Sequence, residues 1–101
     1  MKKFVDFAQN GALAKSLDQV IGIESAPSAK EADIILTDSV NKVLNHLQQT
    51  DKKVIQICHS HLYPMTHLIE DYPKRFRVVD IRRSASILQP ITSALESLAK
   101  E

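Results

Sequence analysis

Short apolar runs alternate with helical patterns along the whole chain, and this alternation predicts the fold. The patterns predict strands at residues 4–8, 22–25, 32–37, 54–58 and 76–81. The clearest of them, 32–37, is continuous and rich in β-branched residues, which is typical of a strand buried on both faces. The run at 54–58 has the same character.

Apolar stripes with helical spacing lie between these runs, at residues 13–21, 40–47, 62–72 and 87–98. The side chains of Asn10, of Asp38 or Ser39, and of Ser60 can cap the first three helices, and Pro90 places the first turn of the last helix near 86–89. Pro27 leaves room for at most one helical turn in the segment 26–31.

Strands that alternate with helices predict a mostly parallel sheet with helices on both faces and right-handed crossovers. We therefore expect one α/β domain spanning residues 1–101. The expected fold is flavodoxin-like and receiver-like, with five parallel strands in the order 2-1-3-4-5 and a reduced or missing second helix. A working site in such a sheet lies at the carboxyl ends of the strands, near the switch in strand order.

Composition excludes several classes of function. The net charge is +1, and the densest basic stretch, residues 74–83, is interrupted by Asp80, so we expect no binding to nucleic acid. Apolar runs reach only four or five residues, so we expect no membrane insertion. The single cysteine, Cys58, suits the reducing cytosol, and we expect a cytoplasmic location.

Three polar residues at the expected strand ends suggest phosphoryl chemistry. Asp38 follows the strongest strand, Asp6 lies in the first strand, and Ser60 follows the fourth. An aspartate that accepts a phosphoryl group needs neighbouring carboxylates for Mg²⁺, a hydroxyl and a cation. No lysine stands at the end of the last strand, and Asp38 is also a good helix cap. We therefore expect no catalytic residue and no cofactor. Mg²⁺ is expected to bind only if Asp38 accepts a phosphoryl group.

The run Cys58-His59-Ser60-His61 raises two other hypotheses. With His67 it offers metal-ligand side chains, but their spacing across a strand-to-helix junction does not favour zinc, and we expect no metal site. Cys58 with His59 or His61 as a base would give a thiol-dependent activity, which predicts a depressed thiol pKa. With only two glycines the chain has neither a Walker loop nor a dinucleotide fingerprint.

The segment Ala-Asp-Ile-Ile-Leu-Thr-Asp at 32–38 resembles the third strand and phosphoacceptor segment of response-regulator receiver domains. On this resemblance, Asp38 falls at the phosphoacceptor position, Asp6 at one position of the acidic pair, and Ser60 near the switch hydroxyl. The chain departs from receivers at Phe7, which follows Asp6 in place of a second acid. It departs again after the last strand, where the sequence Asp-Ile-Arg-Arg lacks the lysine-proline pair.

A closer resemblance is to the degenerate receiver-like, or pseudo-receiver, domains of hybrid sensor histidine kinases, such as that of the Rcs phosphorelay kinase. Segments 34–38 and 54–61 look like the corresponding strands of those domains. The resemblance implies a non-catalytic signalling module of a two-component phosphorelay, on the cytoplasmic side of a membrane-anchored kinase. It would dock on a protein partner, a histidine kinase core or a receiver domain. The alternative is a divergent but active receiver phosphorylated on Asp38. Candidate contact residues are Tyr63, Arg82, Arg83 and the exposed face of the last helix.

Overall fold

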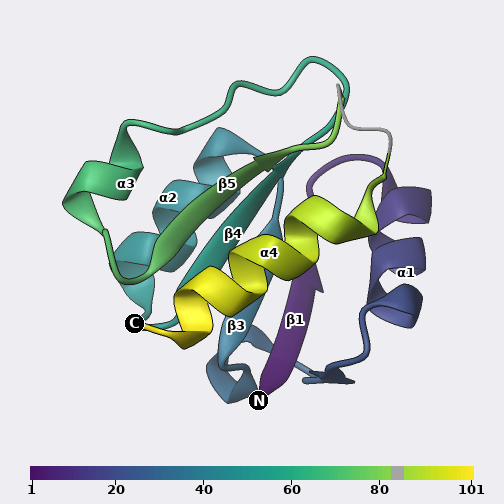
Figure 1. The fold of residues 1–101 in the computed structure, drawn as a ribbon, viewed down its shortest axis with the longest axis horizontal. Coiled ribbons are helices and arrows are strands. Elements are labelled where there is room, and N and C mark those ends of the chain that lie inside the picture. Colours follow the sequence, from purple (N-terminus) through teal and green to yellow (C-terminus); the bar gives the residue numbers. More distant parts are fainter. Residues whose placement is uncertain (83–85) are drawn as a thin grey trace.

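A single parallel sheet with strand order β2-β1-β3-β4-β5 organises the computed structural model, which describes residues 1–82 and 86–101 (Figure 1). The elements are β1 (Lys2–Asp6), α1 (Gly11–Val20), β2 (Glu24–Ser25), a 3-10 turn η1 (Ala29–Glu31), β3 (Ile34–Thr37), α2 (Val40–Gln49), β4 (Lys53–Cys58), α3 (Leu68–Asp71), β5 (Phe76–Asp80) and α4 (Leu88–Ala99). The predicted flavodoxin-like α/β fold and its strand order are confirmed.

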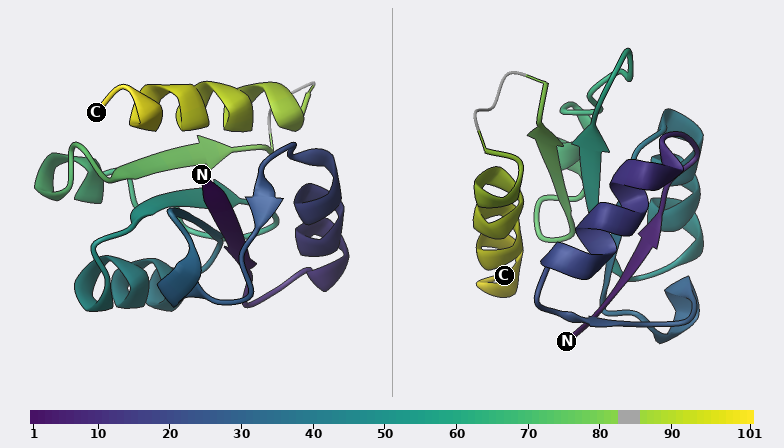
Figure 2. Two further views of the ribbon diagram at one scale, coloured as in Figure 1. Left: turned by 90° about the horizontal axis from the view of Figure 1, so that it is seen from below. Right: turned by 90° about the vertical axis from the view of Figure 1, so that its right-hand side faces the viewer.

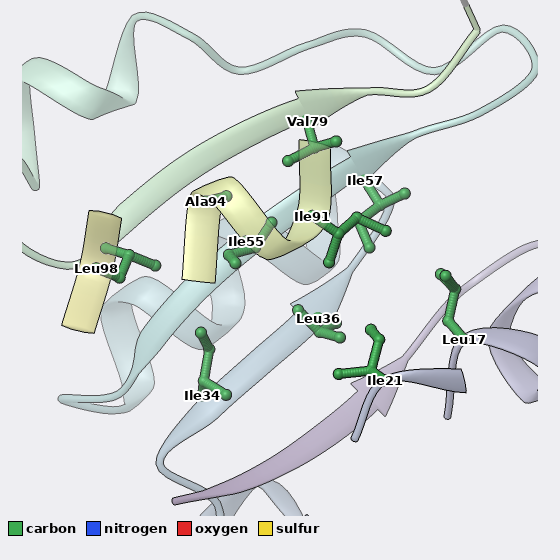
Figure 3. Packing of buried hydrophobic residues seen from close by; sticks show 10 residues of the cluster. All are labelled: Leu17, Ile21, Ile34, Leu36, Ile55, Ile57, Val79, Ile91, Ala94 and Leu98. Atoms are coloured by element: carbon green, nitrogen blue, oxygen red, sulfur yellow. The ribbon is translucent and has the colours of Figure 1, made fainter. Parts of the chain in front are cut away.

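Helices cover both faces of the sheet, as expected (Figure 2). On one face, α1 and α4 pack on alternate residues of the central strands, including Ile34 and Leu36 (Figure 3). On the other face, α2 and α3 pack on the intervening residues, including Ile35. The three apolar side chains of β3, Ile34, Ile35 and Leu36, have no exposed surface, and burial of each contributes about 1.5–3 kcal/mol. The continuous apolar run at 34–36 is therefore explained by burial on both faces.

The second helix is reduced to η1, a single 3-10 turn, which confirms the expectation drawn from Pro27. The edge strand β2 is only two residues long. It is held partly by Lys3, a lysine with 1% exposure, whose Nζ donates to the carbonyl of Ile23 and to Ser25 Oγ. The same Nζ lies 3.3 Å from Asp18 on α1, so the buried charge is paired.

The third helix differs from the sequence expectation. Ser60 does not cap a helix but lies in the left-handed region, with φ 55°, and α3 does not begin until Leu68. The buried amide of Gln56 explains the difference, because it donates to the carbonyl of Tyr63 and accepts from the N–H of Met65. These bonds hold the backbone of 63–65 outside a helix, and Pro64 has no N–H to contribute to one. The helix predicted from the stripe at 62–72, with Ser60 as its cap, was therefore wrong over most of its length.

Candidate functional site

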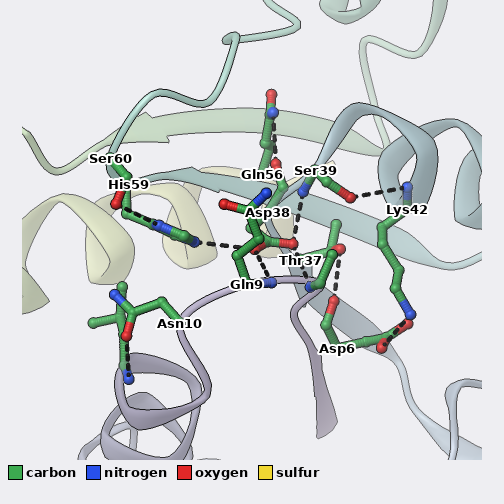
Figure 4. Close-up of polar contacts among 12 residues, drawn as sticks. Asp6, Gln9, Asn10, Thr37, Asp38, Ser39, Lys42, Gln56, His59 and Ser60 are labelled. Carbon is green, nitrogen blue, oxygen red and sulfur yellow. Dashed lines mark hydrogen bonds and ion pairs between the residues drawn. The ribbon is translucent and has the colours of Figure 1, made fainter.

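Asp38 forms the centre of the polar cluster at the carboxyl ends of β1, β3 and β4 (Figure 4). Its side chain is completely buried. Oδ1 accepts from the N–H of Ala8 and of Ser39, both at 2.7 Å. Oδ2 accepts from the N–H of Gln9 at 3.0 Å, and His59 Nε2 lies 3.0 Å from the same oxygen. The four acceptor positions of this carboxylate are thus all used within the protein.

The helix-cap interpretation of Asp38 was only partly right, since Ser39, not Asp38, is the N-cap of α2. Ser39 Oγ accepts from the N–H of Lys42 at 3.5 Å. The carboxylate of Asp38 instead fixes the loop between β1 and α1 through Ala8 and Gln9. That loop leads into α1, whose own N-cap is Asn10, as predicted.

Asp6 does not join Asp38, although both were expected at one site. Its side chain points towards α2, where Oδ1 pairs with Lys42 Nζ at 2.9 Å and Oδ2 contacts His46 Nε2 at 2.8 Å. Successive strand residues point to opposite faces. Asp6 is paired in register with Thr37, one residue before Asp38. The two carboxylates therefore leave the sheet on different sides.

The partners of Asp6 also change its acidity. Burial raises the pKa of this carboxyl, but hydrogen bonds and charge from Lys42 and His46 outweigh burial, so its pKa lies below the ordinary value. Asp6 is consequently held as a structural anion between β1 and α2.

From the sequence, His59 was considered as a metal ligand or as a base for Cys58, but the structure places it against Asp38. The ring is 4% exposed and stacks on Phe7, with centroids 5.5 Å apart and planes 18° apart. The Nε2 atom of this ring contacts Asp38, and its Nδ1 atom lies 3.4 Å from the hydroxyl of Ser60. Ser60 is exposed. Phe7, which the sequence marked only as a departure from receivers, is thus the platform for this imidazole. A signal was present in the position of His59 directly after a buried strand.

The thiol hypothesis is not favoured by the surroundings of Cys58. Burial, together with the charge of Asp80, raises the pKa of this thiol to about 11, the opposite of the depressed value that a reactive cysteine needs. His61 and His67 are exposed, whereas the thiol is buried. Within residues 1–82 and 86–101, no group of three or more His, Cys, Asp or Glu side chains is arranged to hold a metal ion.

The candidate contact residues occupy different surroundings. Tyr63 is 66% exposed. Arg82 forms an ion pair with Asp80 at 2.7 Å and donates to the carbonyls of Ser60 and Leu62, so its guanidinium is already engaged. Arg83 lies outside the described residues. Of the two candidate contact residues that the structure describes, Tyr63 is therefore the more accessible.

Two hollows flank the sheet near these elements. The first, of about 540 Å³, lies beside the start of α2 and is lined by Ala8, Ser39, Asn41, Lys42 and Asn45. The second, of about 300 Å³, lies between α1 and α4 and is lined by Val20, Ile21, Gly22, Ile23, Leu88, Thr92, Leu95 and Glu96. We call the second hollow the α1–α4 groove. Its apolar lining distinguishes it from the polar first hollow.

No protein-family model matches the chain, and no curated protein or solved structure shows significant similarity to it. Among residues 1–82 and 86–101, no helix has the length and apolar character needed to cross a membrane.

Proposed function

We propose that this chain is a receiver-like docking module of a two-component phosphorelay that works without phosphorylation of Asp38. The proposed partner is a histidine kinase core or a receiver domain, on the cytoplasmic side of a membrane-anchored kinase. The observation that carries the proposal is the saturated, completely buried carboxylate of Asp38 at the position where receivers carry their phosphoacceptor.

The hydrogen bonds of Asp38 oppose phosphoryl transfer. A phosphoryl donor must reach a carboxylate oxygen in line, and both oxygens here face N–H groups inside the protein. Attack would require the loss of at least one bond to a charged acceptor, each contributing about 1.5–3 kcal/mol. Asp6, the other carboxylate that Mg²⁺ would need, is turned to α2 and paired with Lys42.

The α1–α4 groove is the surface that best suits docking. Val20 and Leu88 line it and remain 54% and 42% exposed, and Ile87, at 44%, directly precedes α4. Large apolar side chains exposed together are typical of protein-interaction sites. This surface includes the exposed face of the last helix that the sequence indicated.

Incubation with acetyl phosphate and Mg²⁺ tests the chemical half of the proposal. Intact-mass spectrometry is expected to show no acid-labile phosphoprotein for the wild-type chain. An adduct that forms in the wild type and is abolished in Asp38→Asn would establish the alternative, a divergent active receiver.

Docking is tested by titrating the ¹⁵N-labelled chain with purified kinase cores and receiver domains from its own organism. Shift changes are expected to cluster along the α1–α4 groove, and Val20→Glu and Leu88→Glu are expected to weaken binding at least tenfold, about 1.4 kcal/mol or more. Gln48→Glu, at an exposed position of α2 on the opposite face of the sheet, is the matched control. Absence of shift changes with every kinase core and receiver tested would refute docking.

A further inference from the structure

Three side chains at the carboxyl ends of β3 and β4 stand in the order serine, histidine, aspartate. Ser60 is exposed, His59 is 4% exposed, and Asp38 is completely buried. Ser60 Oγ lies 3.4 Å from His59 Nδ1, and His59 Nε2 lies 3.0 Å from Asp38 Oδ2. We propose that Ser60 is a covalent modification site whose hydroxyl takes an acyl group from an activated carboxylic ester.

The hydrogen bonds of Asp38 decide which nitrogen of the neutral imidazole carries the proton. An ionised aspartate only accepts hydrogen bonds, and the other three partners of this carboxylate are backbone N–H groups. Asp38 therefore accepts from an Nε2–H of His59. In the neutral ring the lone pair then lies on Nδ1, the nitrogen that faces the hydroxyl of Ser60. A general base for a serine needs a free lone pair facing the hydroxyl, and Nδ1 supplies it here, with the roles of the two ring nitrogens exchanged relative to the usual Ser-His-Asp arrangement.

The histidine and the serine are both held in place. The imidazole is stacked on Phe7 and bonded to Asp38, and a flip of the ring would break the bond to Asp38. Ser60 has a φ of 55°, which costs a non-glycine residue about 1–2 kcal/mol. The turn is closed by a bond from the N–H of Leu62 to the carbonyl of His59, and Arg82 donates to the carbonyl of Ser60. Strain retained at an exposed nucleophile is a feature of functional sites.

The chemical step uses only these groups and the ester. Ser60 Oγ attacks the carbonyl carbon while its proton moves to His59 Nδ1, and the positive charge of the imidazolium is balanced by Asp38. The bond between Oγ and carbon forms, the bond between carbon and the alcohol oxygen breaks, and the imidazolium returns the proton to the departing alcohol. The product is an O-acyl serine and a free alcohol. This modification is independent of docking at the α1–α4 groove.

The test uses p-nitrophenyl acetate with the folded chain, followed by intact-mass spectrometry and peptide mapping. One acetyl group is expected on Ser60, at a rate about 100-fold above that of the same chain unfolded in urea, the gain typical of a positioned base. Ser60→Ala, at an exposed position, is expected to abolish the adduct. Ser93→Ala, which removes an exposed hydroxyl on α4, is expected to leave it unchanged.

The role of the base is tested with His59→Gln, which is expected to lower the rate to that of the unfolded chain while circular dichroism shows a folded protein. If His59→Gln does not fold, the comparison of folded with unfolded wild type decides the question. Acetylation of other residues only, or a Ser60 rate equal in the folded and unfolded chains, would overturn the proposal.

Discussion

Replacement of Asp38 by asparagine is expected to destabilise the fold severely, although the two side chains have nearly the same shape. The amide nitrogen must take the place of one carboxylate oxygen. At Oδ1 it would face the N–H groups of Ala8 and Ser39. At Oδ2 it would face the N–H of Gln9 and the ring of His59, which can change tautomer to accept.

The second placement is the less costly one, and its cost can be worked out. The N–H of Gln9 loses its acceptor, which costs about 1–3 kcal/mol. The bonds from Ala8 and Ser39 remain, but to a neutral oxygen, which weakens each by roughly 0.5–1 kcal/mol. The expected loss in the free energy of unfolding is therefore about 3 kcal/mol.

Urea unfolding followed by far-ultraviolet circular dichroism measures this loss. With an m value of about 1.5 kcal/mol/M, the midpoint is expected to fall by about 2 M. Asp51→Asn, in the exposed turn before β4, is the control and is expected to change stability by less than about 0.5 kcal/mol. A midpoint for Asp38→Asn that matches this control would refute the reasoning that Asp38 is a structural carboxylate.

Three further predictions concern Gln56, Asp6 and Cys58. Gln56→Met removes three hydrogen bonds, so it is expected to lower the free energy of unfolding in urea by about 3 kcal/mol. Hydrogen exchange of the Met65 amide is expected to become faster, and an unchanged exchange rate would contradict the role of Gln56. The lowered pKa of Asp6 means that its contribution is complete above the ordinary aspartate pKa and is lost as the pH falls through the lower folded value. Asp6→Asn is therefore expected to be less stable than wild type at pH 7, with the difference vanishing in acid; a constant difference would refute this. Cys58, with a pKa of about 11, is expected to react with iodoacetamide at pH 8 far more slowly than in the urea-unfolded chain, and equal rates would revive the thiol hypothesis.

The sequence by itself determined the order of elements and the strand order of the sheet. Continuous apolar runs such as 34–36 can be satisfied only by burial on both faces, and short βα connections allow only right-handed parallel crossovers. Local signals also sufficed for Asn10 as an N-cap and for the loss of the second helix after Pro27. These features depend on residues close together in the chain.

Tertiary structure decided the site. The sequence placed Asp6 and Asp38 at neighbouring strand ends, but a one-residue difference in register sends their side chains to opposite faces of the sheet. The sequence also predicted Ser60 as the cap of a helix. The side-chain amide of Gln56 prevents that helix by bonding the backbone seven and nine residues further along the chain, and local propensity does not reveal such bonds. Which carboxylate is saturated, and which histidine faces it, depends on contacts between residues more than 20 positions apart. Only the packed sheet brings such residues together.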